Sequence, residues 1–198
     1  MTSPYNAPGV TIAEMTGPAM NFNLPKAGLY VSDSEYLSLA GKISLEFLIR
    51  DNGSAAGQTI VSKGGLAFTL AASNTPQISA DFTETDLAVT GDWLWNTDVW
   101  QSVAITWDGE PTTADGVRFY IDGGQHAPGT ATATGTQIPD HGFPLILGNI
   151  DSPISNTTRI LADLDEIRIS NVTRSPDWMR ASFMTQDGQG IEFLEVTP

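Results

Sequence analysis

Apolar and polar side chains alternate at every second position along the middle of this 198-residue chain. The pattern is clearest in residues 43–50, 102–107 and 117–122. Successive side chains of a β-strand point to opposite faces of its sheet, so this spacing predicts strands with one buried face. Leu48 and Ala104 fall on the other face of their strands, so we do not expect that face to be uniformly exposed to water.

Glycine-containing turn sequences separate the alternating segments. They include Asn52-Gly53, Gly64-Gly65, Asp108-Gly109 and Asp122-Gly123, which suit the positive-φ positions of tight hairpins. Many short strands joined by such turns predict an all-β fold, namely an antiparallel two-sheet sandwich or jelly roll.

One short helix is predicted near the end of the chain, over residues 176–185. Ser175 is suited to cap this helix, Pro176 to occupy its first position and Asp177 to interact with the dipole of its first turn. We expect Trp178 to pack the helix against the sandwich.

The composition of the chain ends predicts three segments. Residues 1–18 are rich in proline and glycine, which favours an extended N-terminal arm because proline fixes φ and interrupts strand pairing. Residues 19–185 are expected to form the β-sandwich domain. Residues 186–198 are expected to be a C-terminal arm or strand.

The charge and the lack of cysteine exclude several classes of function. The formal net charge is −14, from 9 basic and 23 acidic residues, and the sequence contains no cysteine. Nucleic acids and anionic membranes bind clustered Lys and Arg, so neither is expected as a partner. Disulfides and thiolate chemistry are excluded. Residues 1–13 lack the pattern of a secretory signal, which favours prior processing, or a protein that reaches its place of action by assembly or lysis.

The order of these segments resembles a known family. The chain contains, in this order, SLEFLIR (44–50), TIVSKGG (59–65), WQSVAITWDG (100–109), VRFYIDGG (117–124), LILGN (145–149), ADLDEIRIS (162–170) and RSPDWMRASF (174–183). This series resembles the laminin G-like branch of the concanavalin A-like lectin/glucanase superfamily. The resemblance implies a concanavalin A-like jelly-roll sandwich of two antiparallel sheets.

Paired acids of the kind that catalyse glycoside hydrolysis are not evident. Glucanases of the superfamily carry two carboxylates on one strand, and the retaining mechanism needs them about 5 Å apart. Asp163 and Asp165 share a face, but they belong to the segment that matches the last strand of the family, and Glu46 stands alone. We therefore expect no enzyme activity.

No cofactor is predicted, although calcium remains an alternative. Calcium prefers oxygen ligands, and Asp165 and Asp33 are the best candidates for it. Ion pairs or backbone hydrogen bonds within the chain are the simpler role for such carboxylates.

Trp93 and Trp95 are the candidate carbohydrate-binding or interface residues. They flank Leu94 in the sequence GDWLWNTD, so their rings would lie on one side of an extended segment. Two roles are open for this pair: stacking on a sugar, or filling an interface or the edge of the sandwich.

The N-terminal arm suggests a first hypothesis about function. Residues 5–14, YNAPGVTIAE, resemble the opening of phage contractile-tail sheath proteins, and such an arm would add a strand to a neighbouring sheet or fold back on its own sandwich. The hypothesis is a non-catalytic structural module of a virus (phage) particle, such as a capsid decoration, head-fibre or tail-associated protein. It would be located in the virion and bind neighbouring subunits, as a homo-oligomer or within a large assembly.

The alternative hypothesis is a lectin-like adhesion domain of a microbial surface. Such a domain would be extracellular or on the cell surface and would bind glycans, with or without calcium.

Overall fold

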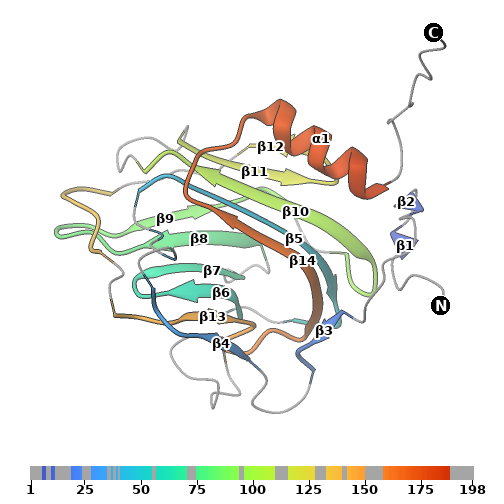
Figure 1. The fold of residues 1–198 in the computed structure, drawn as a ribbon, viewed down its shortest axis with the longest axis horizontal. Coiled ribbons are helices and arrows are strands. Elements are labelled where there is room, and N and C mark those ends of the chain that lie inside the picture. The colour runs from blue at the N-terminus through green and yellow to red at the C-terminus, as the bar shows by residue number, and fades with distance from the viewer. Residues whose placement is uncertain are drawn as a thin grey trace, which may run out of the picture.

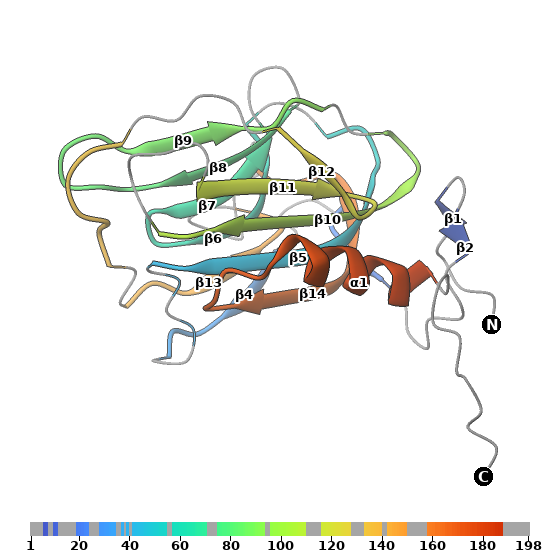
Figure 2. The same ribbon diagram turned by 90° about the horizontal axis from the view of Figure 1, so that it is seen from above.

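Two antiparallel sheets form the body of the protein in the computed structural model. The structure describes residues 6–7, 10–11, 19–23, 28–34, 37, 39, 41–54, 57–70, 75–93, 96–109, 116–127, 133–139, 142–149 and 158–187. Within them, two six-stranded sheets pack face to face and one helix lies beside them (Figures 1 and 2). This arrangement confirms the all-β jelly-roll sandwich predicted from the alternation and from the turns.

Sheet I contains the longest strands. Its spatial order is β12 (Gly124–His126), β11 (Val117–Ile121), β10 (Trp100–Trp107), β5 (Ile43–Asp51), β14 (Ala162–Ser170) and β3 (Met20–Asn21). The central strand β5 pairs with β10 and β14, which are far from it in sequence. The pairing of β14 with β5 shifts register between Asp165 and Arg168, where Glu166 adopts a positive φ of 50°.

Sheet II carries most of the short hairpins. Its spatial order is β4 (Leu29–Val31), β13 (Leu145–Leu147), β6 (Thr59–Lys63), β7 (Leu66–Leu70), β8 (Pro76–Ala80) and β9 (Leu87–Thr90). Strands β6 to β9 follow one another in sequence and in space. The early strand β4 and the late strand β13 complete the sheet at its other edge, so the exposed edge strand β4 comes from a distant part of the chain.

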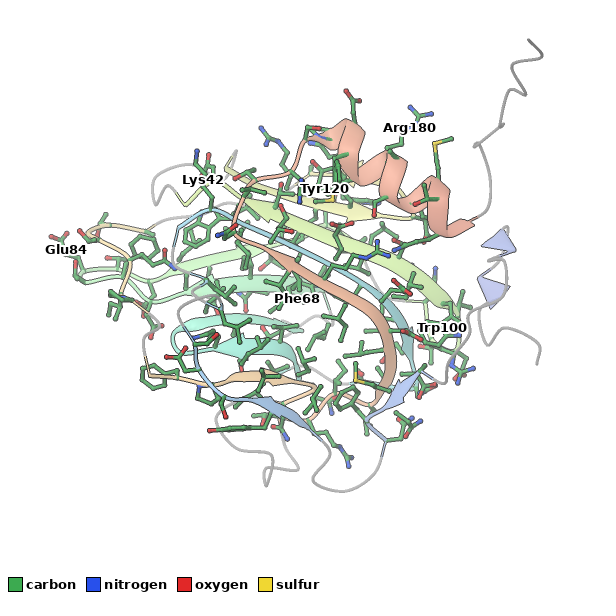
Figure 3. The ribbon with its side chains drawn as sticks, viewed as in Figure 1. Lys42, Phe68, Glu84, Trp100, Tyr120 and Arg180 are labelled. Carbon is green, nitrogen blue, oxygen red and sulfur yellow. The ribbon has the colours of Figure 1, made fainter. Side chains whose placement is uncertain are left out.

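The core lies between the sheets, where the alternating apolar side chains meet. Phe47 of sheet I contacts Phe68 of sheet II with ring centroids 5.6 Å apart, and Figure 3 shows Phe68 in the interior. Trp107 meets Phe82 edge to face at 6.1 Å. The outward residue Leu48 is also fully buried, which agrees with the expectation that the second face of its strand is not uniformly wet.

The helix α1 (Pro176–Asp187) covers part of the outer face of sheet I (Figure 1). It extends two residues beyond the predicted end, and the expectation that Trp178 packs it against the sandwich is wrong. Trp178 is 49% exposed, whereas Met179 is buried against Ala104 and Tyr120. The contact of Met179 with Ala104 and Tyr120 sets the rotation of the helix. Trp178 lies about 100° away around the helix axis and therefore faces solvent.

Further contacts continue along the same side of α1. The Ser182 hydroxyl donates to Oε2 of the buried Glu46 at 2.6 Å, and Phe183 packs on Gly123 of the β11–β12 hairpin so closely that a Cβ there would lie 2.7 Å from its ring. Ser182 and Phe183 follow Met179 by three and four residues, so all three lie on one side of the helix. Glu46 is therefore held beneath the helix, away from solvent.

The predicted terminal arms fall mostly outside the described residues. In the N-terminal arm, β1 (Asn6–Ala7) pairs with β2 (Val10–Thr11) in a separate antiparallel pair that lies against β10. Residues 188–198 lie outside the described part, and α1 crosses the expected domain boundary at residue 185. No helix among the described residues is long and apolar enough to span a lipid bilayer.

Candidate functional site

A shallow hollow with two exposed aromatic rings lies at the β4 edge of sheet II. Tyr30 and Phe143 are 55% and 54% exposed. The hollow has a volume of about 150 Å³ and is lined by Ser62, Gly64, Phe143, Pro144 and Ile146. Tyr30 pairs with Ile146, which pairs with Ser62, so all three side chains share the outer face of the sheet. We call this feature the Tyr30–Phe143 hollow.

The floor of the hollow is fixed by the sheet itself. Ile146 and Ser62 are buried although they are on the outer face, and the Ser62 hydroxyl donates to the Asn149 carbonyl at 3.2 Å. Gly64 has a φ of 55° in the β6–β7 turn, a left-handed conformation that glycine adopts without strain. A regular strand and a tight turn thus hold the polar and apolar parts of the floor.

A buried lysine beneath the hollow ties two loops together. The Lys63 side chain is fully buried, and its Nζ donates to Oδ1 of Asp33 at 2.7 Å and to the Phe143 carbonyl at 2.9 Å. The other carboxylate oxygen of Asp33 accepts the Gly142 N–H at 2.8 Å. These contacts connect the segment after Tyr30 with the residues before β13, so both exposed rings are carried by the same polar cluster.

The pKa of Asp33 is lowered from its ordinary value, first by the hydrogen bond from Lys63 and then by that from the Gly142 backbone. Both of its carboxylate oxygens therefore interact with donors of the chain. A carboxylate neutralised by an ammonium group is a poor calcium ligand, because the lysine already supplies the positive charge. The arrangement matches the internal ion pair that we considered as the simpler role.

Asp165 also uses an oxygen within the chain, since its Oδ1 accepts the Glu166 N–H at 2.6 Å. Burial, followed by repulsion from Glu166, raises the pKa of Asp165. In the described residues no group of three or more His, Asp or Glu side chains is placed to hold a metal ion. Calcium binding at Asp165 thus has no supporting ligand set among these residues.

Replacing Asp165 with asparagine is expected to raise the melting temperature at pH 7 by roughly 1–2 °C. Asparagine keeps the acceptor for Glu166 but removes a partly buried charge. Because the folded-state pKa of Asp165 is raised, its ionisation destabilises the fold as pH increases through that pKa. The difference in melting temperature between the wild type and Asp165→Asn should therefore vanish as pH falls toward 3.8. Thermal melts at several pH values would show this. An equal or lower melting temperature of the variant at pH 7 would contradict this assignment.

The second acid of the pair considered for catalysis is also committed to a structural contact. Asp163 pairs with Asn21 and Arg50 across sheet I, and Nε of Arg50 donates to Asp163 Oδ2 at 2.9 Å. Arg50 in turn stacks over Trp100, with its guanidinium carbon 5.4 Å from the ring centroid. Asp163 is buried, and its carboxylate oxygens are already engaged by these partners, which does not suit a catalytic acid or base.

The two tryptophans singled out in the sequence are placed only in part. Trp93 is 8% exposed. Its ring packs edge to face on the Phe119 ring, with centroids 5.2 Å apart, and its centroid lies 5.1 Å from that of the His126 ring. Trp95 lies outside the described residues. The buried position of Trp93 is that of a side chain at the sandwich edge, and the role of the pair in binding stays a prediction that rests on Trp95.

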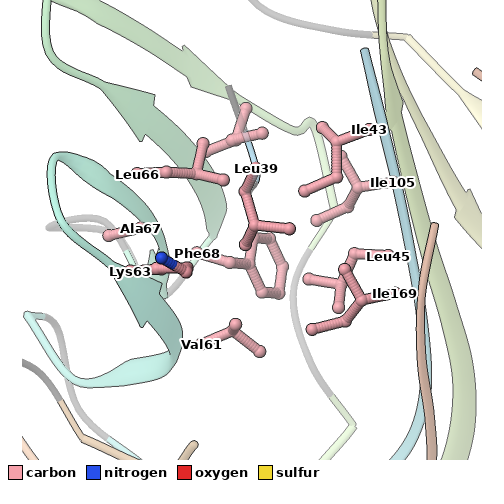
Figure 4. A pocket seen from close by; sticks show the side chains of 11 residues that line it. Leu39, Ile43, Leu45, Val61, Lys63, Leu66, Ala67, Phe68, Ile105 and Ile169 are labelled. Atoms are coloured by element: carbon pink, nitrogen blue, oxygen red, sulfur yellow. The ribbon is translucent and has the colours of Figure 1, made fainter. Parts of the chain in front are cut away.

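A second, interior pocket lies between the sheets and is not a ligand site (Figure 4). Its volume is about 20 Å³, and it is lined almost entirely by core side chains such as Leu45, Phe68 and Ile105, with the aliphatic stem of Lys63 at one side. That volume holds about one water molecule. The Tyr30–Phe143 hollow is therefore the more suitable of the two for a small ligand.

Tyr30 and Phe143 were not predicted from the sequence as binding residues. Each is one aromatic residue in a segment of mixed character, and its exposure depends on the pairing of β4 with β13. The adjacent Phe143-Pro144 step before an apolar strand was the one local signal, because proline in such a place often fixes an exposed loop.

These features define a class: an antiparallel jelly-roll β-sandwich with a shallow, aromatic-flanked hollow on an outer sheet face. The chain belongs to the concanavalin A-like lectin/glucanases superfamily, because the family model Laminin_G_3, described by that name, matches residues 26–180. The resemblance noted in the sequence is thereby confirmed. A search of curated proteins found no match.

Solved structures with the same fold include the binding domain of Paraclostridial Mosquitocidal Protein 1, with a TM-score of 0.62 and 13% identity. The match covers 89% of this chain and 46% of that one. The botulinum neurotoxin serotype G binding domain has the same TM-score of 0.62 and 13% identity, with coverages of 91% and 45%. This chain thus spans less than half the length of either toxin domain.

A third similar structure is the CBM40 domain of Ruminococcus gnavus IT-sialidase bound to α2,3-sialyllactose. Its TM-score is 0.58 at 12% identity, and the match covers 80% of this chain and 98% of that domain. At such low identity these similarities establish the fold alone.

Proposed function

We propose that this protein is a non-catalytic carbohydrate-binding domain that holds a glycan in the Tyr30–Phe143 hollow. The observation that carries the proposal is the pair of exposed rings on a floor fixed by the sheet and by the buried Lys63. Sugar rings present apolar C–H faces that pack on aromatic side chains, while their hydroxyls bond to nearby polar groups. Ser62 and the backbone of the β6–β7 turn supply such polar groups.

The comparisons support this alternative better than the virion role that was the first hypothesis. One similar structure is a carbohydrate-binding module with a bound sialylated sugar, and two are binding domains of toxins. An extracellular or cell-surface location goes with this proposal. A structural role in a phage particle and assembly with neighbouring subunits stay predictions.

The absence of catalysis is part of the proposal, and it is supported by how the acids are used. Asp163 is paired with Arg50, Asp165 accepts a backbone hydrogen bond, and Glu46 accepts from Ser182 beneath α1. None of these three described carboxylates is free to act as an acid or base beside a sugar. The proposed mechanism is therefore binding through surface shape and stacking.

A glycan array probed with the labelled chain, followed by titration calorimetry with the strongest oligosaccharide found, tests the proposal. We expect Tyr30→Ala and Phe143→Ala each to weaken binding by roughly thirtyfold, because removal of a central aromatic contact typically loses about 2 kcal/mol. The double variant should show no measurable binding.

Two controls separate stacking from a general loss of structure. Tyr30→Phe keeps the ring and should retain most of the affinity. Trp178→Ala removes an exposed ring far from the hollow, on α1, and should leave binding to this oligosaccharide unchanged. An array without any binder, or full affinity in the double variant, would refute the proposal.

A further inference from the structure

The basic side chains of the described residues fall into two groups. Arg50, Lys63 and Arg168 each form an ion pair with a carboxylate, and Arg159 has interactions of its own. The second group forms no ion pair with any described residue and consists of Lys42, Arg118, Arg174 and Arg180. For a chain of net charge −14, it matters where these four uncompensated cations lie.

All four lie on the α1 side of sheet I. Arg118 shares a cross-strand row with Thr106, Ser44 and Ser170 on the outer face. The backbone N–H of Arg174 donates to the Ser44 hydroxyl at 2.9 Å, which places Arg174 over the same row. Figure 3 shows Lys42 and Arg180 on the same side of the molecule as α1. Of these four side chains, Arg174 is the one that lines a hollow.

A hollow opens in this region at the end of β14. It has a volume of about 380 Å³ and is lined by Leu37, Leu39, Ile169, Ser170, Asn171, Val172 and Arg174. We call it the Arg174 hollow. It is larger than the Tyr30–Phe143 hollow and belongs to the other sheet, so the two are separate sites.

Arg174 is held in an orientation suited to binding. Its guanidinium carbon lies 4.2 Å from the ring centroid of Trp178, so one face of the guanidinium is covered and its N–H groups remain in the plane of the stack. Its Nε is buried without a hydrogen-bond partner among the described residues. The donors available to a ligand are therefore the terminal Nη groups of Arg174, which lines the hollow.

The groups around Arg174 match one chemical class. A guanidinium binds a carboxylate through two parallel hydrogen bonds. The Asn171 amide and the Ser170 hydroxyl bond to hydroxyl groups, and the half-exposed Trp178 and Val172 offer apolar surface. A ligand with one carboxylate, several hydroxyls and an apolar ring face combines these features.

We propose that the Arg174 hollow is a second binding site, which takes a carboxylate-bearing sugar residue. Uronic acids and sialic acids both provide this chemistry. The site acts independently of the Tyr30–Phe143 hollow, so it does not depend on the function proposed above.

NMR titration of the full ¹⁵N-labelled chain tests this site, with the indole N–H signal of Trp178 as the readout. The probes are methyl β-D-glucuronide, N-acetylneuraminic acid and methyl β-D-glucoside, the last of which has the glucuronide ring without its carboxylate. We expect at least one of the two acidic sugars to shift the signal in a saturable manner, and the glucoside to bind at least about tenfold more weakly. The acidic sugar that binds identifies the source of the carboxylate.

Three variants locate the binding. Arg174→Gln should weaken binding of the acidic sugar by about tenfold or more. Arg180→Gln removes the same charge from the exposed side of α1 outside the hollow, and should change affinity by less than about twofold, since exposed charges are screened. The double variant Tyr30→Ala/Phe143→Ala should bind the acidic sugar as the wild type does. Melting temperatures show whether each variant is folded.

Several results would overturn the proposal. One is no response to either acidic sugar, and another is equal binding of glucoside and glucuronide. Equal losses of affinity for the acidic sugar in Arg174→Gln and Arg180→Gln would show a general electrostatic effect instead of binding at a defined site. A response to an oligoglutamate peptide but to neither sugar would indicate an acidic protein partner in place of a glycan.

Discussion

The variant Trp107→Ala is expected to unfold at a temperature roughly 10 °C or more below that of the wild type. Trp107 is fully buried between the sheets and contacts Phe82 of the opposite layer edge to face. Its own carbonyl also accepts the Thr173 hydroxyl at 2.9 Å, close to the start of α1. Truncation to alanine removes apolar burial and leaves a cavity, which together destabilise a core by about 3–5 kcal/mol.

A matched control exists in the same chain. Trp178→Ala makes the same chemical change at a ring that is 49% exposed, so its melting temperature should fall by only a few degrees at most. Differential scanning calorimetry of both variants measures the contrast. A similar fall in melting temperature in the two variants would show that the contact of Trp107 with the opposite sheet is not central to the fold.

The second large effect is expected for Asp33→Asn, which removes the carboxylate charge that pairs with the buried Lys63 ammonium. Removing one partner of a buried ion pair is strongly destabilising because the other charge stays in a poorly solvated place. We expect the melting temperature to fall by roughly 5 °C or more. Glycan binding should weaken as well, since the same carboxylate holds the Gly142 backbone beside Phe143.

The pH dependence of this effect has a definite sign. The pKa of Asp33 is lowered in the fold, so its ionised form stabilises the protein above the ordinary value of 3.8 and loses that contribution as pH falls through the lower folded-state pKa. The difference in melting temperature between the wild type and Asp33→Asn should therefore be largest at neutral pH and decrease below pH 3.8.

Two further variants test whether the buried Lys63 charge causes this loss of stability. Asp92→Asn breaks the exposed contact between Asp92 and His126 at 3.3 Å, and should have little effect because exposed pairs contribute little. The double variant Asp33→Asn/Lys63→Met replaces the buried charge with an apolar chain of similar length and should recover most of the lost stability. If the double variant were as unstable as Asp33→Asn, the buried charge would not be the reason.

The sequence determined the fold class because burial of one strand face leaves a direct trace in residue order. Alternation in residues 43–50 and 102–107 predicted β5 and β10, and Ser175 with Pro176 predicted the start of α1. These signals are local: a side chain two positions away along a strand faces the same layer, whichever strand is its neighbour. The family resemblance rests on the same local segments.

Only the tertiary structure decided which side chains are available for binding. Trp178 and Met179 are adjacent in the sequence, yet one is exposed and the other is buried, because the contact of α1 with Ala104 and Tyr120 sets the rotation of the helix. Tyr30 is brought next to the hollow that Phe143 lines by the pairing of β4 with β13, which joins strands more than a hundred residues apart. Lys63 is buried where a lysine is ordinarily solvated, because Asp33 and the Phe143 carbonyl converge on it from two loops. Exposure and long-range pairing are properties of the assembled layers, so no window of neighbouring residues contains them.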